Sequence, residues 1–132
     1  MRYLLDTHIL VWWHLDDRQL SRRHREMLAD AQGRGEPLAV SSISLWEIAK
    51  LAEIGRLQFD VSVEECLASI ERNSEIEVLP ISAHVAVEST RLGPKFPRDP
   101  ADQLIAATAR VHGLTLATAD RGIRSSRAVP VV

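Results

Sequence analysis

The chain has very little cysteine, with Cys66 as the single one among its 132 residues. One cysteine cannot form an intramolecular disulfide, and it cannot supply the thiolates that a cysteine-ligated metal site needs. A lone thiol is typical of proteins in a reducing compartment. The sequence therefore predicts a cytoplasmic protein with neither a disulfide framework nor a metal site built on cysteine.

Long apolar segments are absent as well. No apolar run reaches the roughly 18 residues of a membrane span. Asp6 interrupts the amino-terminal segment where a secretory signal would need more apolar residues, so we expect no membrane segment and no signal peptide. The hydrophobic fraction of 45% matches a globular protein and excludes a disordered one. The length suits one ordinary domain, and we expect residues 1–132 to form it.

An excess of positive charge is also lacking. Sixteen basic and eighteen acidic residues give a net charge of −2. A protein that grips nucleic acid mainly by neutralising phosphates is usually basic, so the balance argues against such a binder but not against an enzyme with a local basic rim. All but two of the basic residues are arginine, which suits phosphate recognition. The densest group reads as a solvated helix face: Arg18, Arg22, Arg23 and Arg25.

Short apolar runs alternate with helical stretches along the chain. Alternating strands and helices imply right-handed crossovers and a mainly parallel sheet that is covered on both faces. The fold class predicted from the residues is therefore α/β. We expect strands at 3–5, 38–40, 77–79, 114–118 and 129–132; helices at 9–15, 20–31, 42–54, 63–70, 82–92 and 100–111; and a helical turn at 121–124.

Acidic residues occur where the predicted strands end and the next helices begin. Asp6 directly follows the first strand, Glu47 lies in the helix after the second, and Asp120 follows the fourth. Asp99 and Asp102 begin the helix that precedes that fourth strand. In folds of this kind, ligands bind beyond the carboxyl ends of the strands. The topology can therefore bring all of these acids to one edge of the sheet.

Each acid alone also has an ordinary structural explanation. Asp6 and Asp120 suit the end of a strand or a turn. Asp99 before Pro100 is a favoured helix start, and Asp102 in the first turn gains from the helix dipole. No single one of them indicates a catalytic role.

Glu47 leaves two interpretations open. Ser44 and Glu47 have the spacing of a capping box, in which the glutamate bonds back to the helix start. The helix is apolar on nearly all sides, however, which predicts that it is buried. If Ser41 or Ser42 is the cap, Glu47 lies beyond the first turn, where a buried acid needs a partner or a cavity.

Taken together, the acids indicate a metal site. Clustered carboxylates raise one another's pKa unless a cation balances them. Oxygen ligands favour Mg²⁺ or Mn²⁺ over Zn²⁺, and Mg²⁺ keeps several waters when one or two carboxylates bind it. Such an ion can activate a water and stabilise charge on a phosphate at the same time. Phosphodiester hydrolysis is the chemistry that follows.

Four short motifs carry a resemblance to a known family. They are residues 4–8 (LLDTH), 44–49 (SLWEIA), 99–109 (DPADQLIAATA) and 116–120 (LATAD). In order and spacing they resemble the PIN-domain ribonucleases, and within them the VapC-type toxins of bacterial toxin–antitoxin pairs. The resemblance extends from near the first residue to about Arg124.

The resemblance implies a three-layer α/β/α sandwich that binds Mg²⁺ or Mn²⁺ and cleaves RNA as an endoribonuclease. It also implies a homodimer and a cognate antitoxin that blocks the site. Carried over by motif, the catalytic and metal-binding acids are Asp6, Glu47, Asp102 and the more variable Asp120. Asp99 joins the metal-binding group, with Thr118 and Ser44 as supporting residues. Thr118 would orient a water or a carboxylate. One departure is Gln103, where this branch often has arginine, so a basic contact is in doubt there.

Adjacent tryptophans follow the first motif. Trp12 and Trp13 do not share a helix face, so at least one of them can be exposed. They are either partly buried in the core or, for one of them, an anchor for an antitoxin helix or a dimer partner.

Three other functions are alternatives to the nuclease. A phosphoacceptor receiver domain needs an acidic pair after the first strand and a lysine near the last, and neither is present. A dinucleotide-binding domain needs a glycine-rich turn after the first strand, which is missing. A catalytically silent PIN fold that binds RNA or protein keeps some weight. Such domains usually lose the acids that this chain retains.

Overall fold

The computed structural model describes residues 1–132 as four strands alternating with seven helices. The order along the chain agrees with the sequence-based prediction up to residue 126. The elements are β1 (Tyr3–Leu5), α1 (Thr7–His14), α2 (Arg22–Gly33), β2 (Leu38–Ser41), α3 (Ser42–Glu53), α4 (Val63–Arg72), β3 (Ile76–Leu79), α5 (Ala83–Glu88), α6 (Pro100–His112), β4 (Thr115–Ala117) and α7 (Arg121–Ser126).

The sheet has the strand order β3-β2-β1-β4, and every pair of neighbouring strands is parallel. Leu4 in β1 pairs with Ala39 in β2 and with Leu116 in β4. Parallel strands need crossovers, and helices supply them here. The predicted parallel sheet is confirmed, and all strands end at the same edge.

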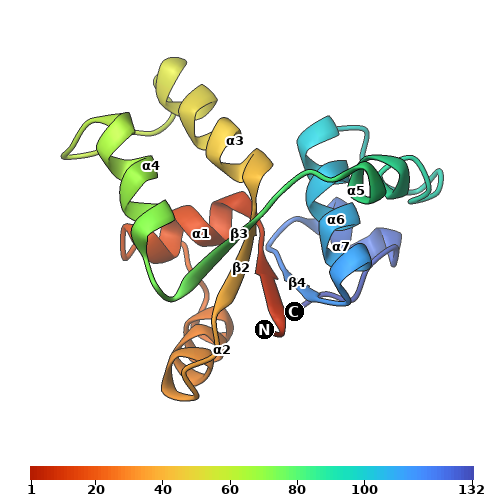
Figure 1. Cartoon of the computed structure of the whole chain (residues 1–132), viewed down its shortest axis with the longest axis horizontal. Helices are drawn as coiled ribbons and strands as arrows, with labels where there is room; N and C mark the ends of the chain where they lie inside the picture. The colour runs from red at the N-terminus through yellow and green to blue at the C-terminus, as the bar shows by residue number, and fades with distance from the viewer.

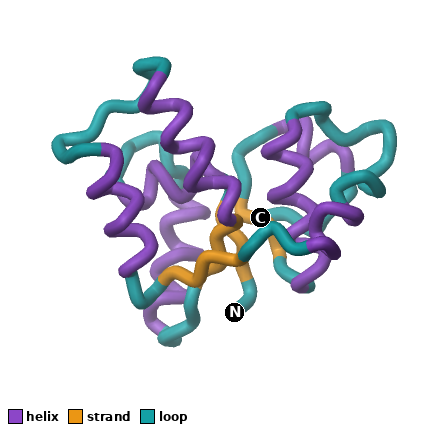
Figure 2. The backbone as a smooth tube through the Cα atoms, turned by 45° about the horizontal axis from the view of Figure 1, so that its top comes forward, coloured by secondary structure: helices purple, strands orange, loops and turns teal.

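Helices cover both faces of this sheet, as Figures 1 and 2 show. Side chains along a strand alternate between the two faces. Leu5 and Ala117 belong to a buried cluster with residues of α1, α2, α3 and α4. Leu4 and Leu116 belong to a second cluster with residues of α6 and α7, and α5 packs on α6. The predicted three-layer α/β/α sandwich is therefore confirmed.

Local signals fix where the helices near the sheet edge begin and end. Ser41 is the N-cap of α3 and accepts a hydrogen bond from the amide of Ile43. Asp99 is the N-cap of α6, which ends at Gly113 in the left-handed conformation. A glycine suits that position because it has no Cβ to clash. None of the helices is both long and apolar enough to span a membrane.

The predicted final strand is wrong. Residues 129–132 make only an isolated parallel bridge, between Val131 and Leu116 beside β4. Pro130 has no amide proton to donate, so a regular ladder cannot run through this segment. The segment lies against the free edge of β4 without lengthening the sheet.

The predicted helix over 82–92 is shorter than expected, because α5 ends at Glu88. The hydroxyls of Ser89 and Thr90 donate to the carbonyls of Ala86 and Val87, at 2.6 and 2.7 Å. Such side-chain bonds compete with the helical pattern, and here they accompany its end.

The two adjacent tryptophans are both half-buried and pack against the cluster on the α1–α4 face. This agrees with the interpretation of Trp12 and Trp13 as partly buried core residues. It leaves part of each ring accessible.

Candidate active site

The predicted acids lie around the edge where the strands end. Asp6 follows β1, Asp120 follows β4 as the N-cap of α7, and Asp102 is in the first turn of α6. Glu47 is in the second turn of α3. Figure 1 shows the starts of α3 and α6 on the same, upper side of the sheet. Four separate elements thus deliver acidic side chains to one region.

Asp6 is the most deeply buried of these acids, with 4% of its surface exposed. Its Oδ1 accepts a hydrogen bond from the Thr7 amide at 2.8 Å, and its Oδ2 accepts one from the Thr118 hydroxyl at 2.7 Å. Burial raises the pKa of Asp6, and these two hydrogen bonds offset part of the rise. The carboxylate is therefore held rigidly at both oxygens.

Thr118 connects Asp6 to Asp120. Its hydroxyl proton goes to Asp6, and its Oγ1 accepts the Asp120 amide at 3.0 Å. Asp120 in turn uses Oδ1 to accept the amide of Ile123 at 2.9 Å, which caps α7. The fully buried Thr118 thus fixes one carboxylate directly and the backbone of the next. Its placement suits the orienting role inferred from the family motif.

Glu47 is held by a chain of hydroxyls. Thr7 donates from Oγ1 to Glu47 Oε1 at 2.5 Å. Since that uses the only hydroxyl proton of Thr7, Ser44 is the donor in its 2.8 Å contact with Thr7 Oγ1. Burial raises the pKa of Glu47, and the negative charges of Asp6 and Asp99 add to the rise. The capping-box interpretation is wrong, because Ser41 caps α3 and Ser44 bonds to Thr7 instead.

The charges of the other four acids act on Asp102. Asp99 Oδ1 accepts the Asp102 amide at 3.1 Å and so begins α6. Partial burial, followed by the charges of Asp6, Asp99, Glu47 and Asp120, raises the pKa of Asp102 to about 7. The helix dipole favours an anion here, yet burial and the surrounding carboxylates outweigh it. Asp102 therefore lies within electrostatic reach of the other four predicted acids.

The donor set fits a hard divalent cation by its chemistry. The available ligands are carboxylate oxygens, which Mg²⁺ and Mn²⁺ prefer. As they stand, no three Asp, Glu, His or Cys side chains are close enough together to form a metal cage. A complete cage is not required, since Mg²⁺ is commonly held through one or two carboxylates and several waters. The raised pKa of Asp102 indicates uncompensated negative charge that such a cation would balance.

Sequence reasoning missed Thr7 as a site residue. Its amide bonds to Asp6 and its hydroxyl to Glu47, so it links these two acids. A signal was present, because Thr7 is a polar residue directly after the first acid. His8, the last residue of the first motif, is exposed and contacts Trp12 with ring centroids 5.7 Å apart. Its charge lowers the pKa of both Asp6 and Glu47.

Sequence comparison gives two matches that cover nearly the whole chain. The family model described as "PIN domain" matches residues 3–127. Ribonuclease VapC22 of Mycobacterium tuberculosis is 38% identical over 124 residues, which cover 94% of this chain and 91% of that relative.

Solved structures share the fold. DNA-bound VapBC from Salmonella typhimurium matches with a TM-score of 0.71 and 24% identity, covering 100% of this chain and 97% of that one. VapBC2 from Rickettsia felis, bound to a promoter DNA fragment, matches with a TM-score of 0.70 and 19% identity, covering 100% and 98%. A toxin–antitoxin complex from Klebsiella pneumoniae matches with a TM-score of 0.62 and 22% identity, covering 98% and 95%.

Proposed function

We propose that this chain is a divalent-metal-dependent endoribonuclease. The premise is its family: it belongs to the PIN-domain family and, within that family, to the VapC-type ribonucleases. The observation that carries the proposal is the group of five acids at the sheet edge. Burial, together with the negative charges of the other four acids, raises the pKa of Asp102 to about 7. A silent binding module has no need to maintain such an unfavourable cluster.

The residues that would hold Mg²⁺ or Mn²⁺ are Asp6, Glu47, Asp102 and Asp120, with Asp99 supporting them from the start of α6. When bound, the ion supplies an activated water for attack on the phosphodiester and stabilises charge on the leaving oxygen. A bound cation would also reduce the net negative charge of the acids, so that the negatively charged RNA backbone could approach.

The contribution of the protein is to hold these oxygens still. Thr7 donates a hydrogen bond to one oxygen of Asp6 and Thr118 to the other. Thr7 also donates to Glu47 and accepts a hydrogen bond from Ser44. Ligating carboxylates that are themselves hydrogen-bonded keep their orientation, and loss of such partners typically lowers activity about 10- to 100-fold. Burial of Asp6 also excludes bulk water from this part of the site.

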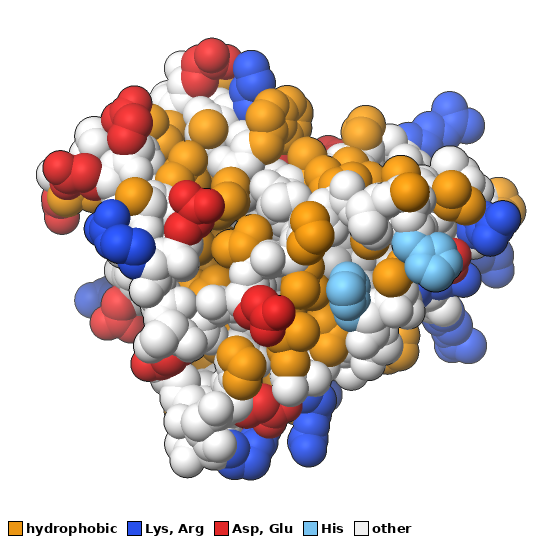
Figure 3. Space-filling view, viewed as in Figure 1, with side chains coloured by type: hydrophobic (Ala, Val, Ile, Leu, Met, Phe, Trp, Pro, Cys, Tyr) orange, Lys and Arg blue, Asp and Glu red, His pale blue; other side chains and the backbone are white.

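Protein partners form a second part of the proposal. We propose that the chain is the toxin of a toxin–antitoxin pair, that it forms a homodimer, and that a cognate antitoxin blocks its site. The support is the Klebsiella pneumoniae neighbour, which is a toxin–antitoxin complex, and the relation to VapC22. Exposed apolar side chains offer contact surface: Trp46, Ile54, Val61, Ile81 and Val87. Figure 3 shows hydrophobic side chains gathered over the α3 and α5 side, with Arg and Lys mostly at the margins.

The first experiment is cleavage of a mixed RNA pool by the purified chain with Mg²⁺, Mn²⁺ or EDTA. Asp102→Ala is run beside it, and Asp30→Ala, an exposed acid on α2, is the matched control. We expect metal-dependent cleavage that Asp102→Ala loses and Asp30→Ala keeps. A folded wild-type protein that binds the metal and leaves RNA intact would instead support the silent binding module.

The partner proposal is tested by light scattering on the purified chain. A dimer has twice the 14.7 kDa mass of the chain. Trp46→Glu adds a charge to an apolar side chain that is 54% exposed. If this surface is the interface, the variant is monomeric and still folded. A monomeric wild-type chain would contradict the dimer and leave the nuclease unaffected.

A further inference from the structure

A groove leads away from the acidic cluster across α1. It consists of two adjoining cavities, of about 300 and 260 Å³, that share the side chains His8, Trp12 and Gln19. The first cavity begins at Asp6 and Asp120. The second is lined further on by Val11, Leu51, Arg56 and Leu57. We call this surface, defined by those side chains, the α1 groove.

An aromatic wall runs along the α1 groove. His8 and Trp12 are one helical turn apart on α1, with their ring planes tilted by 48°. Their centroids are 5.7 Å apart, which leaves no room for a flat ring between them, because a stacked base takes up about 3.4 Å on each side. Trp12 packs one part of its ring on the core, and the remainder lines both cavities. A flat ligand would therefore stack on the open side of Trp12.

Two polar side chains in the α1 groove have no partner within the protein. The backbone amide of Gln19 bonds to Asp17 Oδ1 at 2.8 Å, but no hydrogen bond engages its side-chain amide. Arg56 makes no ion pair, in contrast to Arg22 and Arg25, which each pair with an acid. A free amide can both donate and accept hydrogen bonds, and a free guanidinium can bond two phosphate oxygens.

A tight turn brings Arg56 into this position. Gly55 has φ of +75°, a left-handed conformation that follows the end of α3. The chain then folds back, and the amides of Arg56 and Leu57 both bond to the carbonyl of Leu51. Leu51 and Leu57 thereby form an apolar floor with Arg56 at its rim.

We propose that the α1 groove binds one nucleotide of single-stranded RNA next to the bond that is cut. Its base stacks on Trp12, its polar edge bonds to Gln19, and Arg56 contacts a phosphate further along the strand. This inference rests on the proposed ribonuclease function, because the groove starts at two of the proposed metal-binding acids. It assigns substrate-binding roles to residues outside the acidic cluster.

The chemistry of the α1 groove favours a nucleotide over a protein segment. Single-stranded RNA is recognised by stacking on aromatic rings and by hydrogen bonds to the exposed base edges. Here an aromatic face and a free amide line both cavities, and a free cation lines the cavity farther from the acids. The cavities are close to the lower end of the range of small-ligand pockets, about 300–1,000 Å³. That size suits one base better than a helix of a partner.

The test uses the full chain and a short single-stranded RNA pool of random sequence. Cleavage ends are sequenced to give the base preference at each position beside the cut, and KM and kcat are measured on one preferred sequence. Gln19→Ala should flatten the preference at one flanking position. Arg56→Ala should raise KM several-fold with kcat unchanged. Gln58→Ala and Arg23→Ala, exposed residues outside the groove, are the matched controls.

Trp12 is tested with a pair of variants. Trp12→Leu should raise KM on the order of tenfold, the effect expected from the loss of one base–aromatic stack. Trp12→Phe keeps an aromatic face and should recover most of the affinity. Because Trp12 also packs on the core, Trp12→Leu is interpreted only if it unfolds like the wild type. If Trp12→Leu is less stable than the wild type, the Gln19→Ala and Arg56→Ala variants test the proposal instead.

Binding separates this inference from the proposed function. Affinity for the same labelled RNA is measured in the Asp102→Ala background, without metal, where cleavage is not needed and one repelling charge is gone. Weaker binding by the Gln19→Ala and Arg56→Ala variants supports the α1 groove even if the wild type does not cleave. Unchanged cleavage preference, KM and binding in all of these variants would overturn the assignment. The groove would then belong to another ligand, such as a peptide segment of a protein partner.

Discussion

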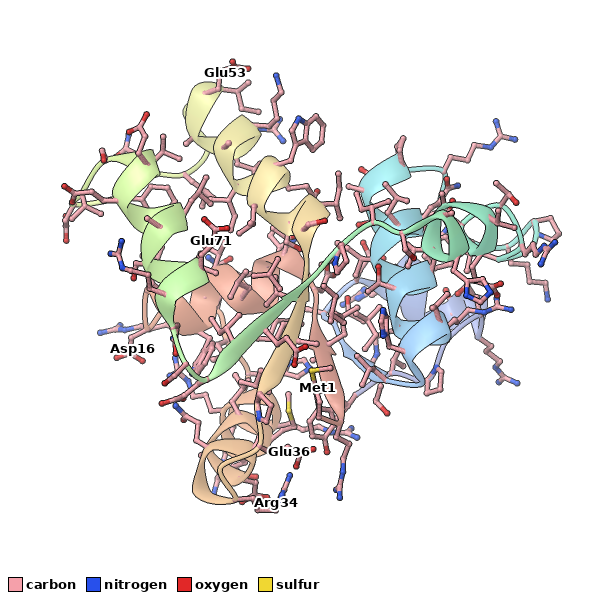
Figure 4. All side chains as sticks on the ribbon, viewed as in Figure 1. Met1, Asp16, Arg34, Glu36, Glu53 and Glu71 are labelled. Atoms are coloured by element: carbon pink, nitrogen blue, oxygen red, sulfur yellow. The ribbon has the colours of Figure 1, made fainter.

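The two ends of the sheet differ in how their acidic residues are balanced by cations. Near the amino ends of the strands, Glu36 lies close to three cations, with its carboxylate 3.6 Å from the Met1 amine, 3.9 Å from Arg2 and 3.2 Å from Arg34. Figure 4 shows the labelled Met1, Arg34 and Glu36 together at this end. At the carboxyl ends, five acids gather without an arginine or lysine paired to any of them. One end is balanced and the other is not.

The pKa values record this difference. Partial burial raises the pKa of Glu36, but the Arg34 hydrogen bond and the charges of the Met1 amine and Arg2 bring it below its usual value. Burial and neighbouring acids raise the pKa of Asp102 to about 7. A charge arrangement that opposes folding persists where it serves another purpose, which is the general mark of a functional site. The imbalance, and not the charge count, distinguishes the acidic edge.

Cavity size alone would point to a different region of the molecule from the acidic edge. A cavity of about 610 Å³, larger than those beside the acids, lies where β4 begins and is lined by His84, Glu88 and Arg110 among others. Arg110 and Glu88 form an ion pair at 3.0 Å there, so its charges are already satisfied. The cavities beside the acids are smaller, but the side chains of Gln19 and Arg56 that line them have no partner within the protein. The proposed function therefore rests on the acidic edge and not on cavity size.

The largest expected effect comes from removing charge at the acidic edge. Asp6→Asn should lower RNA cleavage by at least about 100-fold, because a proposed metal ligand that is held at both oxygens loses its charge. Its stability should stay within about 1 kcal/mol of the wild type, since relief of repulsion offsets a weaker bond to Thr118. Cleavage assays and urea unfolding measure the two quantities. Wild-type cleavage by this variant would remove Asp6 from the mechanism.

A pair of buried threonines sharpens the comparison between site and scaffold. Thr118 and Thr108 are both fully buried, but Thr118 donates to a carboxylate and Thr108 to the Leu104 carbonyl in α6. Thr118→Val should lower cleavage about 10- to 100-fold and stability by about 1.5–3 kcal/mol. Thr108→Val should change cleavage less than about twofold. Equal losses in the two variants would make Thr118 a packing residue only.

The sequence predicted the sheet and the grouping of acids because both depend on local pattern plus topology. The sequence itself shows that one short apolar strand ends at Asp6 and that another is followed by the helix that carries Glu47. Parallel pairing brings the ends of these strands together. The N-cap at Asp99 and the stop at Gly113 were equally local. The N-cap and the helix stop depend only on neighbouring residues, so their prediction needs no information about contacts between distant residues.

The missed features depend on contacts between distant residues. The bond from Thr7 to Glu47 joins positions forty apart, and no spacing rule predicts it. The α1 groove similarly requires the turn at Gly55 to come back beside α1. The final strand failed for a local reason, since Pro130 interrupts the ladder beside β4.

A pH series should show the imbalance at the acidic edge directly. The pKa of Asp102 is about 7 in the folded chain and close to the usual 3.8 when unfolded. Between these values the folded state binds more protons, so the free energy of unfolding falls as pH rises from about 4 to 7. Asp102→Asn should remove part of this slope and stabilise the metal-free protein at pH 8 by about 1 kcal/mol, a figure discounted for partial exposure. A steeper slope in the variant would contradict the assignment.

The smallest effect is expected at the balanced end, with the opposite sign. Because its cations hold the pKa of Glu36 below its usual value, its stabilising contribution is present above the unfolded pKa and is lost as pH falls through the folded one. Glu36→Gln should therefore slightly destabilise the chain at pH 7, where Asp102→Asn stabilises it, and should match the wild type near pH 3. RNA cleavage should remain unchanged. Thermal unfolding of both variants at each pH makes the test, and a stabilised Glu36→Gln at pH 7 would show that the amino end is as unbalanced as the acidic edge.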